Sequence, residues 1–264
     1  MKKITKLVLP VAGLGKRLHP ITLKVPKALV KVGGEPLLDY ILNETNGTDI
    51  RDVILIINPS QRQDFEKYLK LARRKFSDLK FHVRVQRELL GTGHVLLQAG
   101  ELVKKGPFLV RYCDDVLWDR KPFLKQLLEK TKSLEDSATL LTLRRVPKQK
   151  VSRFGVIALK GFDVTRKLYR VSGIIEKPAI KEAPSNLILI GAYVVSTSVM
   201  SQIRRMDRRT KRNRVNDCLP ITDAFALDLA RGGKVYGIEF KGRYLDCGTL
   251  QGLKETAAFL EKQK

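Results

Sequence analysis

The chain has 264 residues, of which 43% are hydrophobic, so it is long enough for a large folded domain and too apolar for disorder to be the default. Its 51 basic and 27 acidic residues give a formal net charge of +24, which favours anionic partners such as phosphorylated metabolites, nucleic acid or anionic membranes. Three cysteines without CxxC spacing argue against a disulfide framework or a zinc knuckle, and they favour a reducing compartment. No stretch approaches the ~20 apolar residues of a membrane span, and the apolar segment 7–12 is too short for a signal-peptide core, so we expect a soluble, cytoplasmic protein without a membrane partner.

Residues 1–145 alternate between strand and helix patterns. In chain order, we expect strands at residues 6–11, 53–57, 81–85, 108–112 and 138–143. We expect helices at residues 36–43, 60–74 and 93–103 and after Pro122, with Ser60 and Gln63 forming a capping box for the second of them. This alternation predicts an α/β fold with a Rossmann-like, mostly parallel sheet and helices on both faces. Such sheets place ligands at the carboxyl ends of their strands.

Residues 146–264 have a smaller, β-rich pattern. Strands are expected at residues 155–159, 169–175, 187–195 and 234–240, with no long helix between the first three. A helix at 222–231 ends at Gly232, and a terminal helix covers 249–261. We therefore expect one domain over residues 1–264, divided into halves at 1–145 and 146–264.

The densest run of charge lies in the second half and contains no aromatic side chain that could stack on a base. The run favours a solvated surface segment, and a nucleic-acid patch is the less favoured alternative. Its members are Arg204, Arg205, Arg208, Arg209, Lys211, Arg212 and Arg214.

A glycine-rich turn, Gly13-Leu14-Gly15-Lys16-Arg17, directly follows the first expected strand. Glycines let backbone N–H groups approach a phosphate, and an arginine adds a fixed cation. Leu18 excludes the dinucleotide fingerprint, and Arg17 stands where a P-loop needs Ser or Thr. Taken alone, the motif favours a simple tight turn over a phosphate site.

A second motif, Lys24-Val25-Pro26-Lys27, puts a lysine on a loop that Pro26 stiffens. Together with the glycine turn it resembles the sugar-phosphate nucleotidyltransferase family. Matching segments continue along almost the whole chain. They are residues 86–94 (QRELLGTGH), 113–115 (CDD), 154–156 (FGV), 176–178 (EKP), 183–186 (APSN) with 191–193 (GAY), 219–224 (LPITDA) and 244–248 (YLDCG).

The resemblance implies a nucleotide-diphospho-sugar transferase fold, with a nucleotide-binding half at 1–145 and a sugar-binding half at 146–264. It implies a reaction in which a sugar 1-phosphate attacks a nucleoside triphosphate and pyrophosphate leaves, with UTP and glucose 1-phosphate favoured. Positioning and charge neutralisation supply most of such catalysis.

The family's roles fall on named residues. Arg17, Lys27 and Asp114 would be catalytic, and Asp114 and Asp246 would hold Mg²⁺, although Asp115 could be confused with Asp114. The nucleotide would be bound by Ala12, Gly13, Gly15, Gln86 and Gly91. The sugar phosphate would be bound by Gly155, Glu176, Lys177, Gly191 and Tyr193. We interpret His94 as structural.

Several alternatives stay open. The enzyme could be a thymidylyl- or guanylyltransferase for another hexose 1-phosphate, or the chain could be a non-catalytic nucleotide-sugar-binding protein on the same scaffold. We also expect a homo-oligomer. Cys113 and Cys247 would flank the metal site, so thiol alkylation is expected to impair activity.

Overall fold

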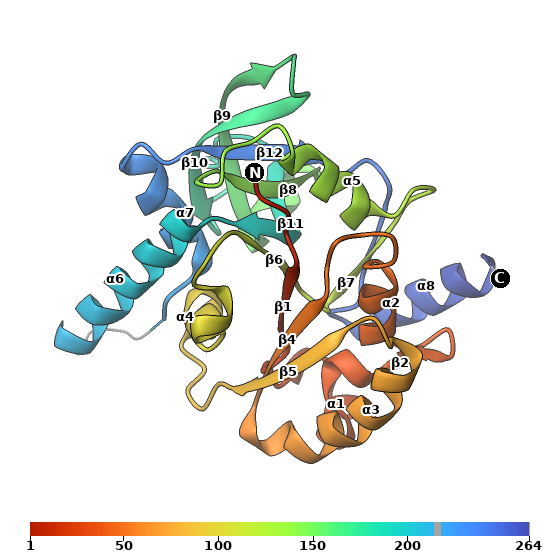
Figure 1. Cartoon of the computed structure of the whole chain (residues 1–264). Coiled ribbons are helices and arrows are strands. Elements are labelled where there is room, and N and C mark those ends of the chain that lie inside the picture. The colour runs from red at the N-terminus through yellow and green to blue at the C-terminus, as the bar shows by residue number, and fades with distance from the viewer. Residues whose placement is uncertain (214–217, 264) are drawn as a thin grey trace.

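One nine-stranded sheet runs through the chain and contains strands from both halves (Figure 1). The computed structural model describes residues 1–213 and 218–263, without the side chains of residues 209–213. The strands of this sheet are β1 (Lys6–Pro10), β4 (Asp52–Ile57), β5 (Lys80–Val85), β6 (Phe108–Arg111), β8 (Thr139–Arg145), β9 (Gly155–Asp163), β10 (Leu168–Glu176), β11 (Leu187–Val195) and β12 (Val235–Glu239). Their order across the sheet is β5-β4-β1-β6-β11-β8-β12-β10-β9.

The strand directions divide the sheet into two regions. Strands β5, β4, β1 and β6 run parallel to one another. Strand β11 is antiparallel to β6 and β8, β12 is parallel to β8, and β10 is antiparallel to β12 and β9. The predicted α/β fold class is confirmed, and the later strands extend the same sheet in mixed directions.

Helices cover both faces of the sheet. On one face lie α2 (Leu37–Asn43), α3 (Arg62–Lys75) and α5 (Phe123–Thr131), and on the other α4 (Gly91–Leu97), α6 (Thr197–Asn213) and α7 (Ile221–Ala230). Successive strand side chains point to opposite faces, so Leu7 and Leu9 of β1 join the first core while Val8 joins the second. Strands buried on both sides need continuous apolar sequences, which is why the sequence pattern located them.

A third, smaller core joins the two ends of the chain. Strand β7 (Asp115–Trp118) pairs antiparallel with β13 (Arg243–Asp246), and α8 (Leu250–Glu261) follows β13. In this core, Leu18 and Val30 of the N-terminal loops are clustered with Leu245, Leu253 and Leu260. The short elements on this side are α1 (Ile21–Lys24), β2 (Lys31–Val32) and β3 (Glu35–Pro36). Sequence analysis did not predict the β7–β13 pair, because its strands are four residues each and distant along the chain.

The predicted capping box at Ser60 and Gln63 is wrong by two residues. The cap is Asn58, whose Oδ1 accepts a hydrogen bond of 3.0 Å from the backbone N–H of Ser60. In return, the backbone N–H of Asn58 donates to Gln61 Oε1 at 3.4 Å. Pro59 disfavours a helical conformation at the preceding residue, so Asn58 is extended (φ −80°, ψ 146°) and the 3-10 turn Pro59–Gln61 starts directly after it.

Helix α6 was not predicted from the sequence, and it contains the start of the charged run, whose described Arg208 is exposed as expected of a solvated surface segment. It is a 17-residue helix whose Val199, Met200 and Ile203 belong to the second core. Their spacing is helical, and they precede the first arginine of the charged run. Arg214 and the side chains of Arg209, Lys211 and Arg212 lie outside the described residues. Within the described part of the chain, no helix combines the length and apolar character needed to cross a membrane.

Substituting Gly252 tests the packing of α8 on β13. A Cβ atom at this position would lie 1.8 Å from the backbone oxygen of Asp246, so Gly252→Ala must push the helix and the strand apart. We expect a loss of about 1–3 kcal/mol in the free energy of unfolding, measured by urea titration. Gly106→Ala is the matched control, because no atom lies within 4 Å of its added Cβ. Equal stability of the two variants would contradict this packing.

Candidate active site

A cavity of about 310 Å³ opens at the carboxyl ends of β1 and β6. The turn after β1 supplies Ala12 and Gly13, and the turn after β6 supplies Asp114. Lys27 and Gly91 line it from the two intervening loops. Five residues predicted from the sequence therefore face one cavity, at the edge of the sheet where parallel strands are expected to bind ligands.

The glycine turn packs directly on the loop that carries Lys27. Gly15 has a left-handed conformation (φ 64°), and a Cβ there would lie 2.9 Å from Thr22 Cγ2 and 3.3 Å from Lys27 Cβ. The hydroxyl of Thr22 donates to the backbone oxygen of Gly15 at 2.9 Å. No atom lies within 4 Å of a Cβ added at Gly13. Gly15 thus fixes the turn against Lys27, while Gly13 leaves backbone open to a ligand.

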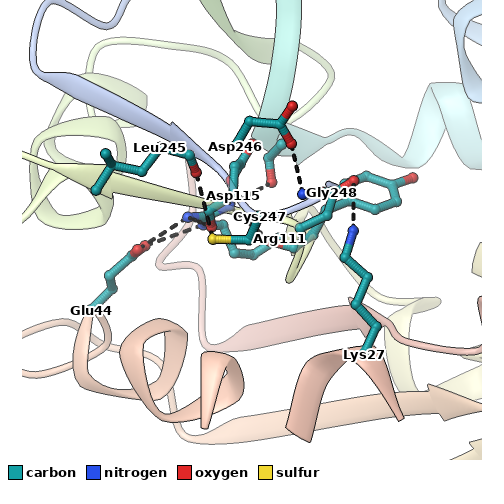
Figure 2. Close-up of polar contacts among 11 residues, drawn as sticks. Lys27, Glu44, Arg111, Asp115, Leu245, Asp246, Cys247 and Gly248 are labelled. Atoms are coloured by element: carbon teal, nitrogen blue, oxygen red, sulfur yellow. Dashed lines mark hydrogen bonds and ion pairs between the residues drawn. The ribbon is translucent and has the colours of Figure 1, made fainter. Parts of the chain in front are cut away.

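Lys27 and Asp114 form an ion pair in this cavity. Lys27 Nζ lies 3.6 Å from Asp114 Oδ2, and the side chains are 17% and 44% exposed, respectively. Figure 2 shows Lys27 extending from its short helical turn towards the centre of the site. A cation and an anion therefore lie side by side in the cavity, next to the glycine turn.

The neighbouring Asp115 faces the opposite way, into a buried ion cluster. Arg111 is fully buried between Glu44, at 3.1 Å, and Asp115 (Figure 2). Burial raises the pKa of Asp115, and the positive charge of Arg111 opposes that rise. The carboxylate of Asp115 is thus committed to Arg111, and Asp114 is the member of the pair that is available to a ligand.

Gly191, predicted to bind the sugar phosphate, borders this same cluster. A Cβ at Gly191 would lie 2.8 Å from Asp115 Oδ2 and 3.2 Å from Arg111 Nη1. Its backbone oxygen accepts a hydrogen bond of 2.8 Å from the N–H of Tyr112. In this structure Gly191 therefore provides the space that the buried ion cluster occupies.

Asp246 is brought next to Asp114 by backbone pairing. Asp246 pairs with Asp115 in the β7–β13 ladder, and the N–H of Cys247 donates to the backbone oxygen of Asp114 at 2.8 Å. Oδ1 of Asp246 accepts from the N–H of Gly248 at 2.7 Å (Figure 2). The guanidinium of Arg17 borders the same glycine, since a Cβ at Gly248 would lie 3.2 Å from Arg17 Nη2. Arg17, Asp114 and Asp246 thus meet at one edge, although Asp246 itself lines a second cavity.

The donor set at this edge suits one particular class of metal. Within residues 1–213 and 218–263, no group of three or more His, Cys, Asp and Glu side chains is arranged to hold an ion. Two carboxylates on adjoining segments nevertheless fit Mg²⁺, which keeps several waters and accepts phosphate oxygens as further ligands.

Three of the five predicted sugar-binding residues, Gly155, Glu176 and Lys177, lie together where β9 and β10 pair. Gly155 is the register partner of Glu176, and a Cβ at Gly155 would lie 3.3 Å from Glu176 Oε2. Lys177 Nζ lies 3.7 Å from Glu176 Oε1, and Lys177 has a left-handed backbone (φ 46°). A non-glycine residue in this region carries strain of about 1–3 kcal/mol, which typically persists at functional positions.

Two residues that sequence analysis did not select adjoin these groups. The hydroxyl of Tyr112 is buried, and Tyr112 lines the first cavity. Its ring packs 5.9 Å from that of the buried Tyr193, which was predicted. The pKa of Asp223 is raised by burial and by the nearby charge of Glu176. The position of Tyr112 at the end of an expected strand could have indicated a site residue. An aromatic ring at such a position is equally typical of the core.

Gln86 and Gly91 differ in how they meet the cavity. Gln86 is buried, and its Nε2 lies 3.1 Å from Nδ1 of His94, so it is not among the residues that line the cavity. Gly91 lines the rim in a left-handed conformation (φ 94°), and a Cβ there would lie 2.9 Å from the backbone oxygen of Leu219. The N–H of Gly93 donates to the same oxygen at 2.6 Å. Residues of the second half thus hold this loop in place.

The comparisons with known proteins agree with this geometry. The model of the nucleotidyl transferase family matches residues 6–263. The chain belongs to this family.

A UTP–glucose-1-phosphate uridylyltransferase from Pseudomonas aeruginosa is 29% identical, with 97% of this chain and 95% of that protein aligned. A solved structure of UDP-glucose pyrophosphorylase complexed with UDP-glucose superposes with a TM-score of 0.84 at 26% identity, covering 99% of this chain and 100% of that one. A UTP-bound UGPase from Acinetobacter baumannii gives a TM-score of 0.80, also at 26% identity, covering 99% of this chain and 94% of that one. The family and fold predicted from the motifs are therefore confirmed.

Burial of two of the three thiols changes the expected result of alkylation. Cys113 lines the cavity and Cys247 follows Asp246, as predicted, but both are buried, and burial raises their pKa values to about 12 and about 11. Cys218 is exposed.

At pH 8 we expect iodoacetamide to modify Cys218 alone in the native protein, because the thiolate is the reactive form. Mass spectrometry should find one modified thiol natively and three in guanidinium; rapid native labelling of Cys113 or Cys247 would contradict the burial.

The buried ion cluster can be tested by Arg111→Met, which leaves Glu44 and Asp115 without a counter-charge. Removal of one partner from a buried ion pair costs about 3–5 kcal/mol, so we expect that loss in the free energy of unfolding at pH 7.5. The loss should shrink towards pH 5. Burial raises the pKa values of Glu44 and Asp115 in the folded protein, and Arg111 opposes that rise. Without Arg111 both folded-state pKa values should lie further above the unfolded ones. The variant should therefore lose stability as pH rises through these folded-state pKa values, and it should lose little below the unfolded pKa.

A triple variant, Arg111→Met with Glu44→Gln and Asp115→Asn, removes all three charges and should regain part of the stability. Urea titrations at both pH values measure these differences. A pH-independent loss in Arg111→Met, unchanged in the triple variant, would mean that the cluster is held by packing and not by charge.

Proposed function

We propose that the chain transfers the uridylyl group of UTP to glucose 1-phosphate, forming UDP-glucose and pyrophosphate. The observation that carries this proposal is the Lys27–Asp114 pair, 3.6 Å apart in a cavity that the glycine turn also lines. The aligned relative from Pseudomonas aeruginosa bears the name of this activity. Similar solved structures hold UDP-glucose and UTP.

The bond changes need little covalent help from the protein. An oxygen of the sugar phosphate attacks the α-phosphorus of UTP, the bond from that phosphorus to the bridging oxygen breaks, and pyrophosphate leaves with the electron pair. Two anions must approach each other, so fixed cations and correct positioning supply most of the rate. We assign the backbone of Ala12 and Gly13, together with Arg17, to the triphosphate.

Lys27 is assigned to the α-phosphate, where negative charge must be balanced as the new bond forms. Packing of Gly15 against Lys27 Cβ fixes the base of this side chain relative to the glycine turn. Its contact with Asp114 holds the ammonium inside the cavity before substrate binds. A preorganised cation costs no rearrangement at the moment of reaction, which makes its charge more effective.

We assign a magnesium ion to Asp114 and Asp246. Bound there, Mg²⁺ would neutralise phosphate charge and orient the phosphates. The protein's own contribution is to hold the two carboxylates on segments joined by the Cys247–Asp114 hydrogen bond. Asp115 is excluded from this role by its commitment to Arg111.

The sugar phosphate is assigned to the second half of the chain. Glu176 would accept hydrogen bonds from sugar hydroxyls, Lys177 would bind the phosphate, and Gly155 leaves Glu176 accessible. Tyr193 would support the sugar site through its packing on Tyr112. Gln86 is buried outside the cavity lining with its amide nitrogen close to His94, so its role at the uracil edge stays a prediction.

The setting of the enzyme is part of the proposal. Three free cysteines, two of them buried, suit a reducing compartment such as the cytoplasm. Assembly as a homo-oligomer stays a prediction, which light scattering on the purified protein can check.

The activity test crosses five nucleoside triphosphates with several sugar 1-phosphates and measures pyrophosphate release with and without Mg²⁺. We expect UTP and glucose 1-phosphate to give the highest kcat/KM and chelation to abolish the reaction. A preference for dTTP or GTP would replace the uridylyl assignment with one of its alternatives. No release with any pair would indicate a binding protein without catalysis.

Site variants then test the assigned roles. Lys27→Ala and Asp114→Asn should each lower kcat by about 10²–10³-fold, because each removes a charge placed for the transition state. Lys67→Ala and Asp78→Asn are matched controls on exposed residues and should keep the wild-type rate. Unchanged kcat in Asp114→Asn would remove this residue from the mechanism.

A further inference from the structure

A second cavity of about 660 Å³ lies between α8 and the segment that joins β8 to β9. It shares no lining residue with the first cavity. We call it the basic cavity, because six cationic side chains line it against two carboxylates, Asp246 and Glu255. The six are Arg144, Arg145, Lys150, Arg153, Arg243 and Lys262.

Most of these cations have no acidic partner in the part of the chain that the structure describes. Arg145 alone has one, with its Nε 3.2 Å from Glu239 Oε1. The two carboxylates of the cavity do not neutralise the rest: Asp246 accepts from the backbone of Gly248, and Glu255 accepts from Gln251. The cavity therefore has a strong excess of positive charge, which attracts anions.

Arg144 is the strongest indication of a missing anion. Its guanidinium is half-buried, donates to the backbone oxygen of Gly242 at 3.0 Å and lies 5.4 Å from the centre of the Tyr244 ring. Among the described residues, no carboxylate lies within ion-pair distance of it, and burial lowers its pKa. Burying a charge without a counter-charge is unfavourable, so an anion bound here would be stabilising.

Two further arginines are held against aromatic rings. Arg153 lies 5.9 Å from the centre of the Phe154 ring, and Arg243 lies 4.5 Å from that of Phe259. A ring face restricts the guanidinium while leaving its N–H donors unused. A planar fork of free donors matches the oxygens of a phosphate group.

Size and charge identify the class of ligand. A volume of about 660 Å³ is within the range of small-molecule sites. We propose that the basic cavity, which borders the site of uridylyl transfer at Asp246, is a second binding site for a small anion that carries two or more phosphate groups.

Calorimetric titration with inorganic tripolyphosphate, without sugar phosphate or Mg²⁺, tests the proposal. We expect two binding events in the wild-type protein. Lys27→Ala should weaken the event at the first cavity. Arg144→Gln with Arg153→Gln should weaken the other at least about tenfold, because each change removes charge-assisted hydrogen bonds. Arg73→Gln with Arg74→Gln, on the exposed side of α3, is the matched control for lost charge and should leave both events unchanged.

Unfolding midpoints establish that the variants fold, and Lys150→Gln with Lys262→Gln provides a second cavity variant that alters only exposed side chains. A single event that Lys27→Ala abolishes and both cavity variants retain would overturn the proposal. So would a single-stranded RNA oligonucleotide that displaces tripolyphosphate from the cavity at lower concentration, because the ligand would then be a nucleic acid. Neither result depends on catalysis, so failure here is distinct from failure of the proposed transfer.

Discussion

The hydrogen bond from Cys247 to Asp114, together with the short β7–β13 ladder, determines the geometry of the whole site. It joins the turn after a central strand to a segment near the end of the chain. Without it, Asp114 and Asp246 would belong to separate parts of the molecule. The ladder is only four residue pairs long, and the third core stabilises it by packing α8 beside the N-terminal loops.

Charge is distributed around this junction in layers. The buried cluster of Glu44, Arg111 and Asp115 contains two negative charges and one positive, and it lies directly behind the turn that carries Asp114. In front of that turn, Lys27 and Arg17 supply positive charge from the N-terminal loops. A protein that is strongly basic overall thus concentrates carboxylates at one internal edge, which is the condition a divalent cation and phosphates together require.

Much of this could be predicted from the sequence, where local signals were strong. Continuous apolar runs located the sheet strands, and glycine and proline positions located the loops around the cavity. The family resemblance favoured Asp114 over Asp115, and the structure adds a physical reason, because Asp115 is buried against Arg111. The basic cavity could not be predicted, since its cations come from β8, β13, the residue after α8 and the segment between β8 and β9. Gln86 was chosen for its chemistry, and only coordinates reveal that His94 occupies one side of its amide.

The third core also has a consequence for how the protein is made. Leu18 and Val30 near the amino terminus are covered by Leu245, Leu253 and Leu260 near the carboxyl terminus. A ribosome releases the glycine-turn region early, yet the apolar neighbours of that region emerge only after every strand of the large sheet. The nascent chain must therefore keep a partly uncovered loop until then, and its substrate site becomes complete only after the sheet strands have been synthesised.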